Sequence, residues 1–145
     1  MSMDFYVMCD RPLASSQEWQ QAIHEIGFDL QIPSGCDVAT MEGFIPVTWR
    51  GRGTGFECSP FPFAELLETY DEKDFGGSWP FAYAMYAGSL GGCAGALIAA
   101  AAIVAVAGGR VYDPQEGLVM TRDEAVRHAA TTEAEILKLE TGTAH

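Results

Sequence analysis

Cysteine and histidine are the side chains in this sequence that could supply a nucleophile and its general base. Four cysteines stand at positions 9, 36, 58 and 93, and three histidines at positions 24, 128 and 145. No two cysteines form a Cys-x-x-Cys pair, so this spacing gives neither a local zinc knuckle nor a redox dithiol of that type. No histidine lies near a cysteine, serine or acid at a hydrolase spacing. A nucleophile at Cys9 or Cys36 stays open, because catalytic groups assemble in space.

Carboxylates are too numerous for any one pair to mark a glycosidase or a metal site, and we expect neither metal nor catalytic residues. The densest acidic group lies between positions 65 and 74 and consists of Glu65, Glu68, Asp71, Glu72 and Asp74. Such a run is typical of a solvated face, and it also suits contact with a basic partner.

A second acidic pair lies in the stretch Asp113-Pro-Gln-Glu-Gly117, which has the composition of a turn. Proline presets the second position of the turn, and Asp113 can accept hydrogen bonds from amides downstream of it. Alternatively, Asp113 and Glu116 could present acceptors to the arginines of a partner. Both interpretations stay open.

The glycines of Arg50-Gly-Arg-Gly-Thr54 could tempt a reader toward a phosphate-binding loop. Their spacing is neither Gly-x-Gly-x-x-Gly nor Gly-x-x-x-x-Gly-Lys, and a hairpin turn between two β-rich runs explains them more simply. We therefore expect no cofactor.

The length and the net charge of the chain limit which classes of function remain. The 145 residues fit one domain, 1–145, with a frayed tail over 140–145. Acidic residues exceed basic ones by 20 to 8, a net charge of −12 that repels nucleic acid and anionic lipid and attracts basic proteins. The same acidity could serve solubility alone. The start of the chain has no basic leader and reads as a strand, so we expect a cytoplasmic protein with reduced thiols.

The expected elements alternate between strands and helices. Capping boxes at Ser15-Ser-Gln-Glu18 and Thr121-Arg-Asp-Glu124 predict two helix starts, and Gly27 predicts the end of the first helix. The predicted strands are 4–9, 28–32, 43–49, 55–59, 79–87 and 110–112, with a short helical segment over 64–70. The order predicts an α+β fold, with an antiparallel-rich sheet and helices on one face. A ferredoxin-like β-α-β-β-β-α-β arrangement with additions is the more specific expectation.

The uncharged segment around 91–110 is long enough for a membrane span, a buried helix or the turn of a nucleotide site. Its Leu, Ile and Val side chains contribute only about −1.5 to −3 kcal/mol to membrane insertion, and its flanks lack a basic cluster. A helix that is apolar all round is typical of a protein interior. We expect a buried helix that ends at Gly108-Gly109, and no stable membrane insertion.

Four pieces of the chain together resemble a known group: Gly43-Phe-Ile-Pro-Val47, Gly55-Phe-Glu57, the alanine-rich helix and Gly109-Arg-Val-Tyr-Asp-Pro-Gln115. Their order over about residues 40–125 resembles immunity-type proteins encoded beside polymorphic or contact-dependent bacterial toxins. The resemblance implies a non-enzymatic protein that binds and neutralises a cognate toxin, a nuclease or another cytoplasmic effector, through an acidic surface. It carries no catalytic residues.

Two rival interpretations stay open. One is a small ligand-binding domain or enzyme whose pocket is lined by aromatic side chains, namely Trp49, Phe56, Trp79, Tyr83 and Tyr112. The other is a membrane-anchored accessory protein.

Overall fold

One antiparallel sheet forms the centre of the protein. The computed structural model describes residues 3–35 and 43–142, and within them the sheet has seven strands in the order β2-β3-β4-β5-β1-β6-β7. The strands are β1 (Met3–Cys9), β2 (Leu30–Gln31), β3 (Phe44–Trp49), β4 (Arg52–Pro60), β5 (Phe81–Ala87), β6 (Gly109–Asp113) and β7 (Leu118–Met120). Every neighbouring pair is antiparallel.

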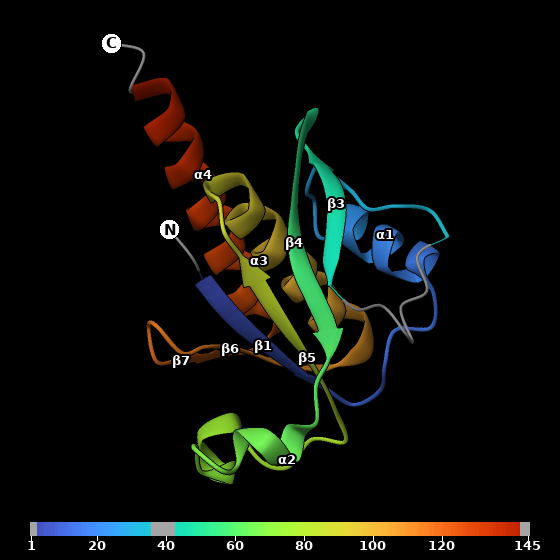
Figure 1. The fold of residues 1–145 in the computed structure, drawn as a ribbon, viewed down its shortest axis with the longest axis vertical. Helices are drawn as coiled ribbons and strands as arrows, with labels where there is room; N and C mark the ends of the chain where they lie inside the picture. Colours follow the sequence, from blue (N-terminus) through green and yellow to red (C-terminus); the bar gives the residue numbers. More distant parts are fainter. Residues whose placement is uncertain (1–2, 36–42, 143–145) are drawn as a thin grey trace.

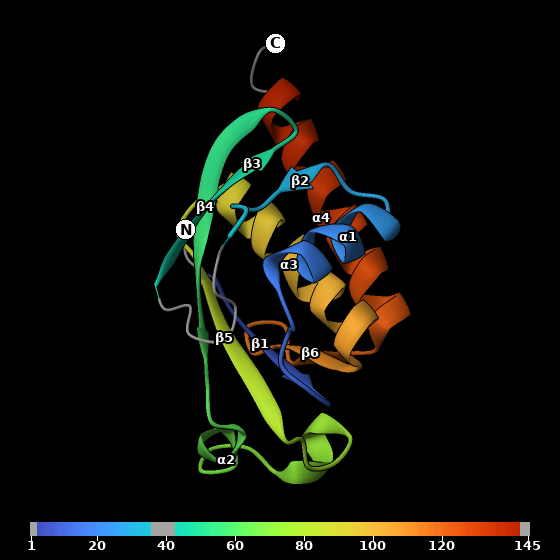
Figure 2. The ribbon, with the colours of Figure 1, turned by 90° about the vertical axis from the view of Figure 1, so that its right-hand side faces the viewer.

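Three helices, α1 (Ser16–Glu25), α3 (Leu90–Ala107) and α4 (Arg122–Gly142), lie together on one face of this sheet (Figure 2). The predicted α+β class, with an antiparallel sheet and helices on one face, is confirmed. The four central strands run β4-β5-β1-β6, and the chain passes through α1 between β1 and β4 and through α3 between β5 and β6. The ferredoxin-like arrangement itself stays a prediction.

Helix α3 is the centre of the main core, which the alanine-rich composition makes possible. Its alanines from Ala99 to Ala102 are fully buried, and small side chains let the helix approach the sheet and α1 closely. The indole N–H of Trp19 on α1 donates to the carbonyl of Ala99 at 3.1 Å. By length and composition α3 could cross a membrane, with a mean hydropathy of 2.3, but 78% of it is buried within the fold, as in the core helix of a soluble protein.

Both predicted helix starts are confirmed by their hydrogen bonds. Ser15 Oγ accepts from the amide of Glu18 at 3.0 Å, and the Glu124 carboxylate accepts from the amide of Thr121 at 3.1 Å. Helix α4 continues through Gly142, into the segment where a frayed tail was expected, and the fraying itself stays a prediction. Residues 143–145 lie outside the described part of the chain.

Several predicted strand boundaries were wrong, because contacts with other parts of the fold determine where these strands begin and end. Strand β2 is only two residues long, because the Gln20 side chain on α1 binds the carbonyl of Leu30 and the amide of Ile32. Strand β4 begins at Arg52, since the hairpin turn needs only Arg50 and Gly51, both at positive φ. Strand β7 was not predicted.

The segment between β4 and β5 forms a lobe, residues 61–79, at one end of the sheet (Figure 1). It contains a short helix, α2 (Phe63–Leu66), and a 3-10 turn, η1 (Glu72–Phe75), in place of the predicted helix over 64–70. Trp79, expected in β5, belongs to the lobe and donates its indole N–H to the carbonyl of Phe75 at 2.8 Å.

Candidate functional site

The lobe carries the predicted acidic group on the side of the sheet opposite the three helices. Its apolar side chains Phe63, Leu66 and Phe75 pack against strand residues whose side chains point away from the helices, namely Met8, Ala82 and Tyr112. The structure thus brings the predicted carboxylates onto one lobe: Glu65, Glu68, Asp71 and Asp74 are exposed, and Glu72 lies in η1. Burial of the apolar side of the lobe leaves Glu65, Glu68, Asp71 and Asp74 facing outward.

Hydrogen bonds from backbone amides to carboxylates stabilise the turn around η1 in the lobe. Asp74 Oδ2 accepts from the amide of Asp71 at 3.1 Å, and Asp71 Oδ1 accepts from the amide of Lys73 at 3.1 Å. Lys73 Nζ lies 3.8 Å from Asp71 Oδ2, with 85% of its side chain exposed, so this pair contributes little to stability. No group of three His, Cys, Asp or Glu residues within the described part of the chain could hold a metal ion.

The structure places Asp113 and Glu116 away from the acidic residues of the lobe. Tyr112 faces the lobe, whereas Asp113, the next residue on β6, points toward α4 on the helix side. Asp113 is completely buried, and its Oδ1 accepts from the amides of Gln115 at 3.0 Å and Glu116 at 3.2 Å. This geometry supports the structural interpretation of Asp113, and it places the carboxylate beneath the surface of the turn. Glu116 is exposed in the turn.

A row of four side chains crosses the face of the sheet that the helices leave free. Strand register places Phe44 beside Glu57, Glu57 beside Tyr86, and Tyr86 beside Asp4. Residues directly opposite each other in antiparallel strands point to the same side, so the four form one line over β3, β4, β5 and β1. Phe44 is 64% exposed and Tyr86 41% exposed, and both carboxylates are exposed. We call these four residues the exposed row.

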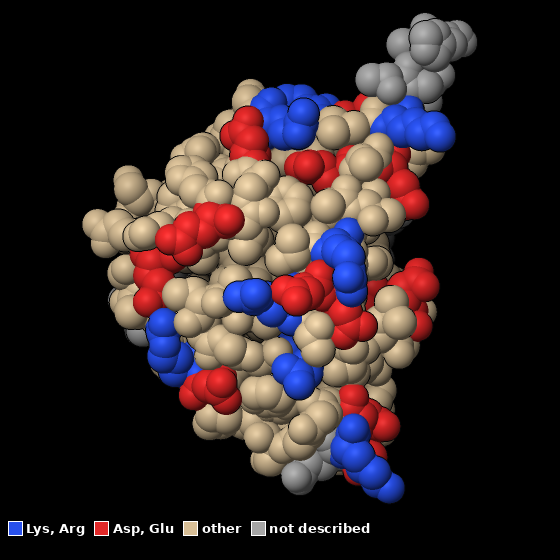
Figure 3. Space-filling view, turned by 180° about the vertical axis from the view of Figure 1, so that it is seen from behind, with Lys and Arg blue, Asp and Glu red and all other residues tan. Residues whose placement is uncertain are grey.

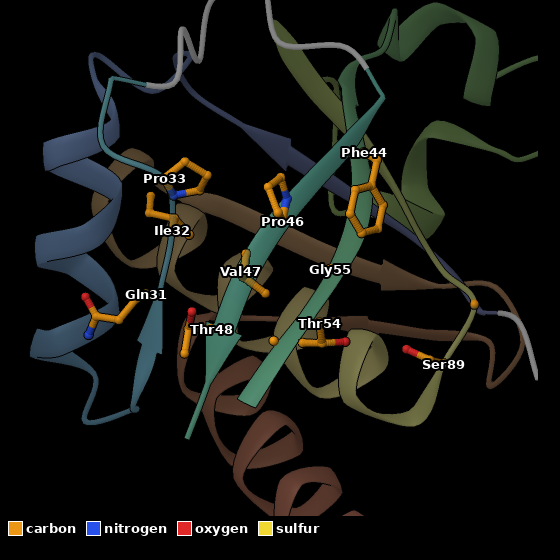
Figure 4. Close-up of a pocket in the computed structure, with 12 residues that line it drawn as sticks. Gln31, Ile32, Pro33, Phe44, Pro46, Val47, Thr48, Thr54, Gly55 and Ser89 are labelled. Atoms are coloured by element: carbon orange, nitrogen blue, oxygen red, sulfur yellow. The ribbon is translucent and has the colours of Figure 1, made fainter. Parts of the chain in front are cut away.

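A shallow groove of about 820 Å³ runs beside the Phe44 end of the exposed row (Figure 4). Ile32, Pro33 and Pro46 give it apolar walls, and the backbone of Gly55 forms part of its floor. A side chain at Gly55 would overlap the ring of Phe44, which lies over this glycine. The groove thus extends the apolar surface that Phe44 begins.

The helix side presents a different distribution of charge. Lys and Arg side chains there lie among Asp and Glu side chains over the whole view (Figure 3). Arg11 pairs with Glu18 at 2.9 Å, Arg52 pairs with Glu140, and Arg50 approaches Glu133 at 3.7 Å. These three arginines on the helix side are therefore paired with carboxylates of the same chain.

Burial keeps the thiols of Cys9 and Cys93 in the protonated form. Burial, followed by the nearby Asp10 carboxylate, raises the pKa of Cys9 to about 12, and burial with Asp113 raises the pKa of Cys93 to about 11. Cys58 is buried as well. A nucleophilic thiol needs a lowered pKa, so the geometry disfavours the Cys9 hypothesis. Cys36 lies outside the described residues.

The aromatic side chains suggested for a ligand pocket do not share one. Trp49, Phe56 and Tyr83 are buried in the core on the helix side, whereas Tyr112 and Trp79 belong to the cluster under the lobe. The sheet separates the two groups, so the pocket hypothesis in that form was wrong.

Sequence reasoning missed the exposed row. Alternation along Phe44–Trp49 indicated that every second side chain faces outward, but nothing local could place Tyr86 between Glu57 and Asp4. No protein-family model, curated protein or solved structure matches this chain.

Proposed function

We propose that this protein is a non-enzymatic, immunity-type inhibitor that binds a basic surface of a bacterial toxin in the cytoplasm through the exposed row and the acidic lobe. The observation that carries the proposal is the exposed row itself. Two large rings are exposed to solvent there, and each has a carboxylate beside it.

The chemistry of the row suits a protein partner with exposed lysines and arginines. Aromatic side chains supply most of the binding energy in protein interfaces, and they act as anchors when a rim excludes water around them. Arginine guanidinium groups stack on tyrosine and phenylalanine rings and form paired hydrogen bonds with carboxylates. Alternation of ring and carboxylate along the exposed row offers both contacts to one arginine-rich surface.

Carboxylates of the exposed row and of the lobe support docking of a basic partner on this face. The carboxylates of Asp4, Glu57, Glu65 and Glu68 pair with no Lys or Arg of residues 3–35 and 43–142. Uncompensated acids on one face steer a basic partner toward that face and speed its association. A toxin that acts on nucleic acid would present such a basic surface.

The test starts from capture of the partner. Tagged wild-type protein is used to isolate a partner from the native host, and the partner gene is then expressed alone and with the inhibitor in a second bacterium. Wild-type protein should restore growth. Tyr86→Ala, which removes one anchor, should weaken binding by about 10- to 100-fold, as expected when an interface aromatic is truncated, and should fail to protect.

A matched control comes from the helix side. Leu118 on β7 is 43% exposed and lies opposite Asp113, so Leu118→Ala removes a comparably exposed apolar group away from the exposed row. This variant should bind and protect like wild type. Equal loss in both variants, or a captured protein that does not impair growth, would contradict the proposed function.

A further inference from the structure

A second, smaller cavity lies on the helix side, between the start of α3, the end of β6 and the middle of α4. Its volume is about 220 Å³, below the roughly 300–1,000 Å³ of sites for drug-sized ligands. It therefore suits a group of the size of one amino-acid side chain. Five apolar or sulfur-containing side chains line it, namely Met3, Leu90, Cys93, Ile136 and Leu139.

One oxygen of a buried carboxylate in the wall of this cavity lacks a hydrogen bond. Asp113 uses Oδ1 for the two amides of its turn, but Oδ2 accepts no hydrogen bond from any described residue. Asp113 is 0% exposed, and a buried carboxylate oxygen without a donor is costly. A cationic hydrogen-bond donor would satisfy Asp113 Oδ2.

The nearest cationic candidate does not fill that role. His128 Nε2 lies 3.9 Å from Asp113 Oδ2, which is beyond hydrogen-bond distance. The Cys93 thiol, which also lines the cavity, donates to the thioether of Met3 instead. Two further carboxylates, Glu116 and Glu135, border the cavity and add negative potential around it.

We propose that this cavity binds a primary ammonium or guanidinium group carried on a short apolar stem. The charged head would donate to Asp113 Oδ2, and the stem would lie against Leu90, Ile136 and the other apolar wall residues. Free amines and the lysine or arginine side chains of another protein share this chemistry. The cavity and the exposed row lie on opposite faces of the sheet, so failure of one leaves the test of the other intact.

The experiment is an NMR titration of the full-length, ¹⁵N-labelled protein at pH 8 and 0.3 M salt. The salt suppresses weak surface pairing. The probes are n-butylammonium, n-butylguanidinium and the neutral n-butanol, with a capped Ala-Ala-Arg-Ala-Ala peptide as the protein-borne source. At least one cationic probe should shift the amides of Gln115 and Glu116 saturably, and n-butanol should not.

Two variants and a control decide the assignment. Asp113→Asn keeps an acceptor for the turn and should weaken binding by about 10- to 100-fold, the loss expected for one charge-assisted hydrogen bond. Thr132→Phe should block the cavity without touching Asp113. Asp71→Asn, on the lobe, should change nothing.

Preference for the peptide over the free cations would assign the site to a protein partner, and the reverse preference to a small metabolite-like amine. Unchanged affinity in Asp113→Asn, equal binding of n-butanol, or no saturable shift with any cationic probe would overturn the proposal.

Discussion

The start of α3 passes so close to β4 that two glycines three residues apart should respond in opposite ways to alanine. A Cβ added at Gly92 would overlap the backbone carbonyl of Gly55 and lie 2.9 Å from Ser89 Oγ, which caps the helix by accepting from the Gly92 amide. A Cβ added at Gly95 would meet Leu30, Phe56 and Val47 at 3.6 Å, which is ordinary contact.

The magnitudes follow from these distances. Both substitutions gain about 0.8–1.0 kcal/mol of helix propensity, so that term cancels in the comparison. Gly92→Ala must displace backbone, and overpacking of this kind costs about 1–3 kcal/mol. Gly95→Ala should therefore be stabilised by about 1 kcal/mol, and Gly92→Ala should be less stable than Gly95→Ala by about 1–3 kcal/mol.

Urea unfolding followed by circular dichroism measures both free energies of unfolding, with the slope m checked for two-state behaviour. For a domain of this size, about 1 kcal/mol corresponds to roughly 2–4 °C in Tm. Equal stability of the two variants would refute the packing of the α3 N-terminus on the Gly55 backbone.

Three further predictions test the helix layer. Ala100→Asp should lower the free energy of unfolding by about 4 kcal/mol or more in urea titrations, because Ala100 is 0% exposed and the charge would have no partner. The side-chain hydrogen bonds from Arg11 lower the pKa of Glu18, so its stabilising contribution is present above about pH 4.3 and is lost as pH falls through the lowered value. Glu18→Gln should therefore show a smaller loss of stability between pH 6 and pH 3 than wild type. Glu133 Oε2 accepts from Trp49 Nε1 at 2.8 Å, so Glu133→Ala should cost about 1–3 kcal/mol, and much less once Trp49→Phe has removed the donor.

Helix positions could be predicted from the sequence because their signals are local. The Ser15 and Thr121 caps and the Gly27 stop each depend on residues within one turn, and the structure has all three, with Gly27 at a φ of +90°. The burial of α3 followed from its uniformly apolar surface. Such signals need no knowledge of the rest of the fold.

Strand lengths and the candidate site depend on contacts between distant parts of the chain. Strand β2 ends early because Gln20, ten residues before Leu30, binds its backbone from a neighbouring helix. The exposed row joins Asp4 to Tyr86 across more than half of the sequence, through strand register alone. The alternation of apolar and polar residues shows which side chains of a strand face the core. A shift of strand register by two residues would keep that alternation but would separate the four residues of the exposed row.

The pairing of arginines on the helix side and the rings beside carboxylates on the open face together indicate how a partner would approach. On the helix side, Arg11, Arg50 and Arg52 each lie against a carboxylate of the same chain, so a basic partner that docked at those carboxylates would have to displace an existing pair. Such a displacement contributes little binding free energy, because the carboxylate only exchanges the arginine of its own chain for a cation of the partner. Asp4 and Glu57 in the exposed row offer a new pair without that exchange, beside rings that gain from losing water. Charge therefore favours docking on the open face of the sheet, and the apolar area of Phe44 and Tyr86 gives the docked state its stability.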